Sequence, residues 1–229
     1  MIGIICAMKI EADAIRASLA DTKTETVSGV EFTTGTLHGK EIVIAVCGIG
    51  KVFAAICTEA MIIKYSPELI INSGVAGTLT DVLSIGDIAI AKDLVQHDMD
   101  TSALGDPVGL VSGINKIYFE ADENAVKAFE NAVKEVGANS ATGTIASGDQ
   151  FMSDTEKKNA IRDRFSAIAC EMEGAAIAHV AYVNGVPFAV LRAISDSASG
   201  DAQMEYPKFV AMAAARSHAI IDAFVKLWK

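Results

Sequence analysis

Short apolar runs alternate along this chain with longer segments of helical periodicity, and this alternation limits the possible folds more than any other feature. The apolar runs, at 2–6, 68–72, 87–95, 141–147, 166–170 and 187–195, are typical of strands buried on both faces. The helical segments lie at 11–19, 52–64, 121–136, 173–184 and 207–228, with a further helix from Asp154 to about 163. Strands at 30–37 and 41–47 flank a hairpin turn at 38–40. We therefore expect an α/β fold, in which helices cover both faces of a sheet.

The chain is expected to form a single domain over residues 1–229. No proline- or serine-rich linker divides it, and its 51% of hydrophobic residues suffice for a sizeable core. No apolar run approaches the ~18 residues that a membrane helix needs, and no basic residue precedes the apolar start as in a secretory signal. Residues 98–118 show no period and are expected to form a long loop, functional or disordered.

The net charge and the cysteine content limit the classes of binding partner and the cellular compartment that we expect. A net charge of −10 leaves no basic patch for nucleic acid. The four cysteines, Cys6, Cys47, Cys57 and Cys170, form no CxxC motif, and three of them end or follow apolar runs. We interpret them as small buried hydrophobes in a reducing cytoplasm rather than as nucleophiles.

Several familiar motifs are incomplete in this sequence. The run Gly48-Ile49-Gly50 begins a dinucleotide-binding pattern whose third glycine position holds Phe53, and Val52 stands where a P-loop needs a hydroxyl group for magnesium. Neither GxSxG nor HExxH occurs. Residues 97–100 (HDMD) include metal-ligand types, but a solvated turn explains this spacing better than a metal site does. No metal and no organic cofactor are expected.

Polar residues gather instead just beyond the ends of the predicted strands. The segments are Glu11, 73–77, 147–151, 171–173 and 195–196. Ligands of open α/β sheets bind beyond the carboxyl ends of the strands. We therefore expect one pocket with several carboxylates, in which glycine-rich turns bring the backbone close to a flat ligand.

Three carboxylates in that set, Glu11, Glu173 and Asp196, suit the cleavage of a glycosidic bond. One acid protonates the leaving group, another carboxylate orients water, and nearby anions stabilise the cationic transition state. Structural interpretations compete, because both glutamates suit a helix N-terminus and Asp196 suits a turn. Arg192, inside an apolar strand, needs a carboxylate partner whether its role is functional or structural. Spacing alone predicts an α/β enzyme that acts on a small molecule.

Seven motifs follow one another through nearly the whole chain in the order of a known family. They are IGIICAMKIEAD at 2–13, GIGKVFAA at 48–55, INSGVAGTL at 71–79, GDI at 86–88, ASGDQFM at 146–152, CEMEGAAIAHV at 170–180 and VPFAVLRAISD at 186–196. On these motifs the chain resembles the bacterial 5′-methylthioadenosine/S-adenosylhomocysteine nucleosidases of the purine nucleoside phosphorylase superfamily. The resemblance implies a three-layer α/β/α sandwich around a twisted, mixed central sheet.

The resemblance also implies a reaction, which is hydrolysis of the N-glycosidic bond of 5′-methylthioadenosine, S-adenosylhomocysteine and 5′-deoxyadenosine. The products are adenine and the corresponding thioribose or deoxyribose. Asp196 is implied as the general acid that protonates purine N7, held in place by Ser195. Glu11 is implied to position and activate the attacking water, with Arg192 nearby, and Glu173 to accept hydrogen bonds from the ribose hydroxyls.

Further contacts to the nucleoside follow from the same resemblance. Met172 is implied to pack on the ribose, Ile49 on the alkylthio group and Phe151 on adenine, while Tyr206 closes the pocket. The other substrate-binding residues so implied are Met8, Val75, Ala76, Gly77, Gln150, Met152, Glu171 and Leu104. The family assembles as homodimers, and Leu104 belongs to a loop near 104–112 that is implied to reach the partner's alkylthio pocket. An apolar patch at 46–61 is the candidate interface.

Departures from the family pattern concern the 5′ end of the substrate. Val75 replaces a serine common near the water site, Lys9 and Ile10 stand where glutamates are frequent, and Leu104 and Asp106 replace aromatic residues of the partner loop. The preferred 5′-substituent therefore stays open.

Three other functions stay open as well. A phosphorylase of the same fold needs cationic groups for phosphate, and the loops after 2–6 and 68–72 carry no arginine. A hydrolase of futalosine or 6-amino-6-deoxyfutalosine would use the same chemistry at N7. The last alternative is a catalytically silent nucleoside-binding module, which the intact set of Glu11, Glu173 and Asp196 disfavours.

Overall fold

A computed structural model describes residues 1–198 and 202–228 of the chain. Its strands are β1 (Ile2–Cys6), β2 (Ala20–Val27), β3 (Val30–Leu37), β4 (Lys40–Val46), β5 (Leu69–Thr78), β6 (Ile88–Gln96), β7 (Tyr118–Glu120), β8 (Ser140–Ser147), β9 (Ala167–Glu171) and β10 (Phe188–Asp196). Its helices are α1 (Lys9–Ala17), α2 (Lys51–Tyr65), the short 3₁₀ turn η1 (Ser102–Leu104), α3 (Glu123–Val136), α4 (Thr155–Phe165), α5 (Gly174–Asn184) and α6 (Ala202–Leu227).

The strands form one mixed sheet. Parallel pairs join β4 to β1, β1 to β5 and β5 to β10, and β3 and β2 continue the sheet antiparallel to its outer edge. On the other side β10 pairs with β6, β6 with β8, β8 with β9, and β9 again with β5. These pairings form a closed ring of five strands, β5, β10, β6, β8 and β9. The ring brings together the ends of strands that are far apart in the sequence.

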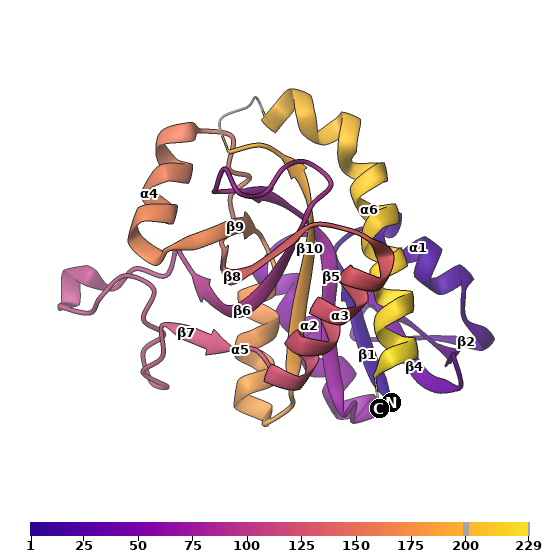
Figure 1. Ribbon diagram of the computed structural model, residues 1–229. Helices are drawn as coiled ribbons and strands as arrows, with labels where there is room; N and C mark the ends of the chain where they lie inside the picture. The colour runs from indigo at the N-terminus through magenta and orange to yellow at the C-terminus, as the bar shows by residue number, and fades with distance from the viewer. Residues whose placement is uncertain (199–201, 229) are drawn as a thin grey trace.

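Helices cover both faces of this sheet, so the predicted α/β/α sandwich with a mixed central sheet is confirmed. On one face α1, α3 and α6 pack over buried residues such as Ile71, Phe129 and Phe224, and Figure 1 shows α3 and α6 crossing in front of the strands. On the other face α2 and α5 pack over a second core that includes Met61 and Ile70. Helix α4 packs on β8 and β9 through Ile161 and other residues of a third cluster.

Two strands have no counterpart in the sequence prediction. Strand β2 (ADTKTETV) is almost fully exposed at the edge of the sheet, so it lacks the apolar alternation by which strands are recognised. Strand β7 is three residues long and pairs with β6 at the end of the predicted loop 98–118. Before β7 this loop is irregular as predicted, and Asp106 orders it by accepting hydrogen bonds from Thr101 and Ser112.

Two element boundaries were predicted wrongly. Strand β5 runs on to Thr78, so the segment 73–77 is strand rather than a turn after 72, because it stays paired with β10. Helix α6 begins at Ala202 rather than near 207, so Pro207 lies inside the helix instead of at its first position. The predicted buried stripe of α6 does face the core through Ala213, Ile221 and Phe224.

All four cysteines are free and buried, as predicted. Within residues 1–198 and 202–228, no helix combines the length and the apolar character needed to cross a membrane.

Candidate active site

The carboxyl ends of β5, β9 and β10 and the segment that follows β1 meet around a cavity of about 320 Å³, a volume that suits a small organic ligand. Its lining comprises Ala7, Met8, Glu11, Ile49, Val75, Ala76, Gly77, Phe151, Cys170, Glu171, Met172, Glu173, Ser195, Asp196 and Tyr206. A smaller hollow of about 30 Å³ shares part of this lining and adds Gln150 and Met152. The structure therefore brings together the polar segments that the sequence places at the strand ends.

Two of the residues singled out in the sequence lie outside this lining. Arg192 is buried behind the cavity wall. Leu104 is 84% exposed on η1 and lines neither hollow within the described chain. Because its expected contact is with a partner subunit, that contact stays a prediction.

Glu11 reaches the cavity from the first turn of α1 and is 2% exposed. Its carboxylate accepts hydrogen bonds from the backbone N–H groups of Met8 (2.9 Å), Ala7 (3.0 Å) and Val75 (3.1 Å). Burial raises the pKa of Glu11, against the opposing effects of Arg192 and these N–H donors. The predicted place in the first turn of a helix is confirmed, and the same carboxylate also faces the cavity.

Glu173 stands at the start of α5 but does not cap that helix. Its carboxylate accepts a hydrogen bond from the N–H of Gly50 (2.8 Å) and lies 3.9 Å from the Arg192 guanidinium. Burial, and next the negative charge of Glu171, raises the pKa of Glu173 to about 7, although Arg192 opposes the rise. The cavity therefore holds a carboxyl group that changes charge near neutral pH.

Glu173→Gln is expected to stabilise the fold by about 3 kcal/mol at pH 8 and by little at pH 4.5. With its pKa raised in the folded state, Glu173 favours folding below its ordinary pKa, and this contribution disappears as the pH rises toward 7. The uncharged glutamine does not titrate, so the difference between variant and parent grows over this range. Urea unfolding at several pH values measures it, and a constant difference would contradict the raised pKa.

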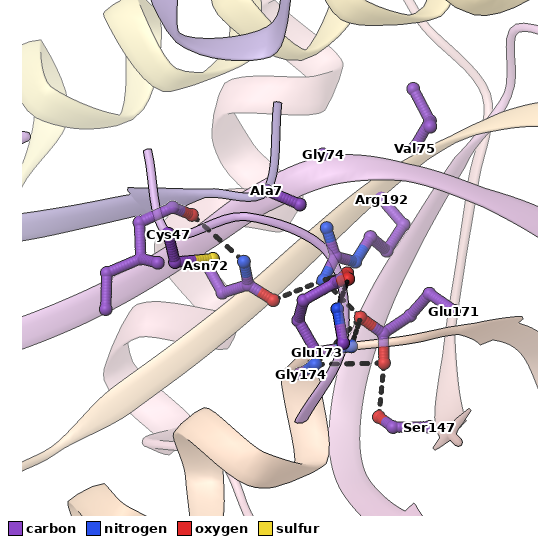
Figure 2. Close-up of polar contacts among 12 residues, drawn as sticks. Ala7, Cys47, Asn72, Gly74, Val75, Ser147, Glu171, Glu173, Gly174 and Arg192 are labelled. Carbon is purple, nitrogen blue, oxygen red and sulfur yellow. Dashed lines mark hydrogen bonds and ion pairs between the residues drawn. The ribbon is translucent and has the colours of Figure 1, made fainter. Parts of the chain in front are cut away.

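The buried Arg192 side chain does not line the cavity. Figure 2 shows it among the side chains of Asn72, Glu171 and Glu173. It donates to the Glu171 carboxylate and to the Asn72 side-chain oxygen, while Asn72 donates to the Ile5 carbonyl at 2.9 Å. Burial alone would lower the pKa of Arg192, but Glu171, Glu173 and Glu11 outweigh it and raise that pKa. Arg192 thus holds the wall carboxylates in place without reaching the lining.

Glu171 lines the cavity, but its carboxylate already accepts hydrogen bonds from donors within the protein. It accepts hydrogen bonds from Ser147, Arg192 and the N–H groups of Glu173 and Gly174. A carboxylate offers about four acceptor sites, so these donors fill it. These contacts tie Glu171 to Arg192 and to the start of α5. The direct substrate contact expected of Glu171 stays a prediction.

Asp196, the last residue of β10, is 3% exposed and lines the cavity. The Ser195 hydroxyl donates to its Oδ1 atom at 3.0 Å, and the Lys158 ammonium donates to its Oδ2 atom at 2.9 Å. Asp196 therefore belongs to a buried ion pair with Lys158, which α4 contributes and which the sequence prediction missed.

Two glycines of β5 make room for these charged groups. A Cβ atom on Gly74 would overlap Arg192 and Glu11, and a Cβ atom on Gly77 would lie 2.6 Å from Asp196 Oδ2. Both glycines therefore allow close packing with these side chains, and they lie in a strand rather than in a turn. Gly77 also lines the cavity, and the approach of its backbone to a ligand stays a prediction.

The open side of the cavity is apolar. The rings of Phe151 and Tyr206 meet edge to face with centroids 5.6 Å apart, and the Tyr206 hydroxyl lies 3.1 Å from the Met8 sulfur. Ile49 is 56% exposed and Phe151 49% exposed, so both present apolar surface that a ligand could cover. Met172 is half-buried in the lining.

Four contributors to the site were missed from the sequence. Ala7 and Cys170 belong to the wall, while Asn72 and Lys158 hold Arg192 and Asp196. Asn72 and Cys170 each end an apolar run and Ala7 follows one, so their positions could have drawn attention to them, whereas nothing in the spacing of Lys158 distinguishes it. Asp98, weighed as a metal ligand, instead pairs with Lys51 at 2.6 Å.

Comparison with known proteins identifies relatives of this fold and site. The model of the phosphorylase superfamily matches residues 1–226. The 5′-methylthioadenosine/S-adenosylhomocysteine nucleosidase of Shewanella loihica is 39% identical over 227 residues, which cover 98% of this chain and 98% of that protein.

Solved structures of similar proteins superpose closely on this chain. The nucleosidase of Neisseria meningitidis in complex with methylthio-immucillin-A superposes with a TM-score of 0.95 at 34% identity, over 98% of both chains. The native futalosine hydrolase of Helicobacter pylori strain 26695 superposes with a TM-score of 0.93 at 36% identity, over 98% of this chain and 96% of that one.

Proposed function

Because the chain belongs to the phosphorylase superfamily and, within it, to the 5′-methylthioadenosine/S-adenosylhomocysteine nucleosidases, which are N-glycosyl hydrolases, we propose that it hydrolyses these two nucleosides and 5′-deoxyadenosine. Each substrate would release adenine. The apolar lining around Met8, Ile49 and Tyr206 suits a thioether or methyl group at the 5′ position.

Asp196 is the proposed general acid. Protonation of N7 makes adenine a neutral leaving group when the bond between C1′ and N9 breaks. In support, Asp196 lines the cavity together with Phe151, on which the base would stack, and Ser195 fixes the Asp196 carboxylate from its other oxygen.

Glu11 is the proposed partner of the attacking water. Three backbone N–H groups fix its carboxylate, and its raised pKa makes it a better proton acceptor than an ordinary glutamate. Water would add to C1′ while Glu11 takes its proton. Glu173, held by Gly50, is proposed to accept from the ribose hydroxyls, an interaction that strengthens as the sugar becomes cationic.

The acidic lining of the cavity is the observation that favours hydrolysis over phosphorolysis. Within the part of the chain that the structure describes, the lining includes Glu11, Glu171, Glu173 and Asp196 but neither lysine nor arginine. Phosphate binding calls for cationic groups that reach the ligand. Arg192 cannot serve, because the carboxylates of the wall already surround it.

The test is adenine release from 5′-methylthioadenosine, followed by chromatography in phosphate-free buffer and again with phosphate added. Rapid release at equal rates in both buffers is expected. Release that depends on phosphate would make the enzyme a phosphorylase, and no release in either buffer would refute the assignment of this substrate.

A futalosine-type substrate is the second candidate, because the H. pylori futalosine hydrolase shares this fold at 36% identity. The chemistry at N7 would be unchanged, and the bulkier 5′ group would extend past Ile49, which is 56% exposed. Parallel assays with 6-amino-6-deoxyfutalosine decide between the two, since the ratio of kcat/KM values reports specificity directly.

A homodimer is proposed as the working unit. Helix α2 exposes Val52, Phe53, Ile56 and Ile63, and a hollow of about 410 Å³ is lined mainly by residues of α2 and α5. Exposed apolar residues on one face are typical of protein interfaces. In such a dimer the partner's loop near 104–112 would cover the alkylthio pocket. The four free, buried cysteines support a cytoplasmic location.

Val52→Glu is expected to dissociate the dimer and to lower kcat/KM for 5′-methylthioadenosine by about tenfold, because each pocket loses its partner loop. Light scattering after gel filtration measures the mass. Val82→Glu is the control, since Val82 is similarly exposed (74% against 70%) but lies outside α2 and α5. A Val52→Glu protein that stays dimeric would place the interface elsewhere.

A further inference from the structure

Lys158 is a buried charged residue beside the cavity to which the proposed mechanism gives no role. Its side chain is 2% exposed, whereas its neighbour Lys157 on α4 is exposed. The Lys158 ammonium donates to Asp196 Oδ2 at 2.9 Å and to the Ser197 carbonyl at 2.8 Å. Because a buried ammonium is costly, it persists only where a negative partner offsets its desolvation.

The groups around Asp196 leave Lys158 as the cation that offsets the negative charge of the Asp196 carboxylate. Cys170 from β9 and Tyr206 from α6 face the same region, and burial raises the pKa of Cys170 to about 12 and that of Tyr206 above its usual value. Both are therefore neutral near pH 7. Glu11 and Glu173 also lie around the cavity and would oppose a negative charge on Asp196. Among the described residues, Lys158 is the cation in contact with Asp196.

We propose that Lys158 is a positioning residue that keeps Asp196 ionised and oriented in the substrate-free site, so that the proton for N7 enters only as the purine binds. This inference rests on the proposed function. On binding, Asp196 takes one proton from the solvent and passes it to N7 as the bond between C1′ and N9 breaks. Asp196 then pairs with Lys158 again, and the proton that Glu11 takes from water returns to the solvent.

The proposal predicts how many protons the protein takes up when a purine binds. Adenine itself presents N7 to Asp196, so its binding is expected to take up about one proton per site at pH 7. In Lys158→Met, Asp196 becomes a buried carboxyl group without a cation, and burial then favours the neutral acid before any ligand arrives. Proton uptake on adenine binding should therefore fall to less than half of the parent value.

Calorimetric titration with adenine, in buffers of different ionisation enthalpy, measures this uptake. The ligand control is 7-deazaadenine, which carries a C–H group at position 7 and should bind without proton uptake. The protein control is Lys157→Met, which removes the same charge from the exposed neighbouring position and should match the parent. Lys158→Arg keeps the cation and should restore most of the uptake.

Lys158→Gln serves if Lys158→Met does not fold, because the amide still donates to Asp196 without its charge. Unchanged uptake in the folded, uncharged variants would overturn the role of Lys158, as would a parent protein that takes up no proton. The measurement needs no turnover. A parent protein that binds adenine but releases none from 5′-methylthioadenosine would instead refute the proposed function.

Discussion

Asp196→Asn is expected to slow adenine release from 5′-methylthioadenosine by about a thousandfold, because general acid catalysis typically contributes 10²–10⁴-fold. Asparagine keeps the shape of the side chain, and its single carbonyl oxygen can accept from either Ser195 or Lys158, but its amide cannot deliver a proton to N7. Without that proton, adenine must leave as an anion. The loss should therefore appear in kcat, with a much smaller change in KM, since the stacking surface of Phe151 is untouched.

A change of leaving group separates acid catalysis from structural damage. A 5-methylthioribosyl substrate with p-nitrophenolate as its leaving group departs without protonation, so Asp196→Asn should cleave it at close to the parent rate. Single-turnover measurements on both substrates would show the contrast. Adenine release that survives the substitution would remove Asp196 as the acid, and equal losses on both substrates would point to a misplaced sugar instead.

The architecture was predictable because its signals are local. The apolar runs of β1, β8 and β10 and the stripes of α3 and α6 follow from hydrophobic periodicity alone. Strand β2 could not be found in this way, since its pairing with β3 at the sheet edge buries almost nothing. The extension of β5 beyond Asn72 depends on pairing with β10 as far as Gly77 and with β9 at Gly77 and Thr78, both of which come much later in the chain.

The site was predictable only in part, because some of its residues are placed by local signals and others only by the tertiary structure. Glu11, Glu173 and Asp196 stand next to strand ends, so the sheet topology suffices to bring them together. Lys158 lies in the first turn of a polar helix, next to an exposed lysine, and nothing in its spacing distinguishes the two. Its burial follows from how α4 packs on β8 and β9, which brings Lys158 against Asp196 at the end of β10 and is a property of the tertiary structure.

The charges of the site fit a reaction with a cationic intermediate. Arg192 offsets the repulsion among Glu11, Glu171 and Glu173 in the free enzyme, although it leaves the pKa values of Glu11 and Glu173 raised. Positive charge that develops on the ribose would relieve this repulsion. The carboxylates would therefore interact more strongly with the transition state than with the neutral nucleoside, which is the condition for catalysis.

Glu11→Gln tests that argument and is expected to lower kcat by about a hundredfold or more, with adenine binding unchanged. Glutamine keeps one acceptor oxygen but cannot take the proton of the attacking water. Two N–H groups, from Ala7 and Met8, donate to Oε2 and one, from Val75, donates to Oε1. Whichever way the amide turns, its NH₂ group therefore opposes at least one donor.

That conflict would weaken the fold, whereas removal of a buried charge would stabilise it, so the two effects on unfolding free energy partly offset each other. Asp13→Asn is the control, because Asp13 lies on the same helix with its side chain 55% exposed. It should leave kcat and adenine binding as in the parent. If Glu11→Gln kept the full kcat, the proton of water would have to leave by another route. The anionic cavity would then act through charge alone, with Glu173 as the remaining carboxylate that titrates near neutral pH.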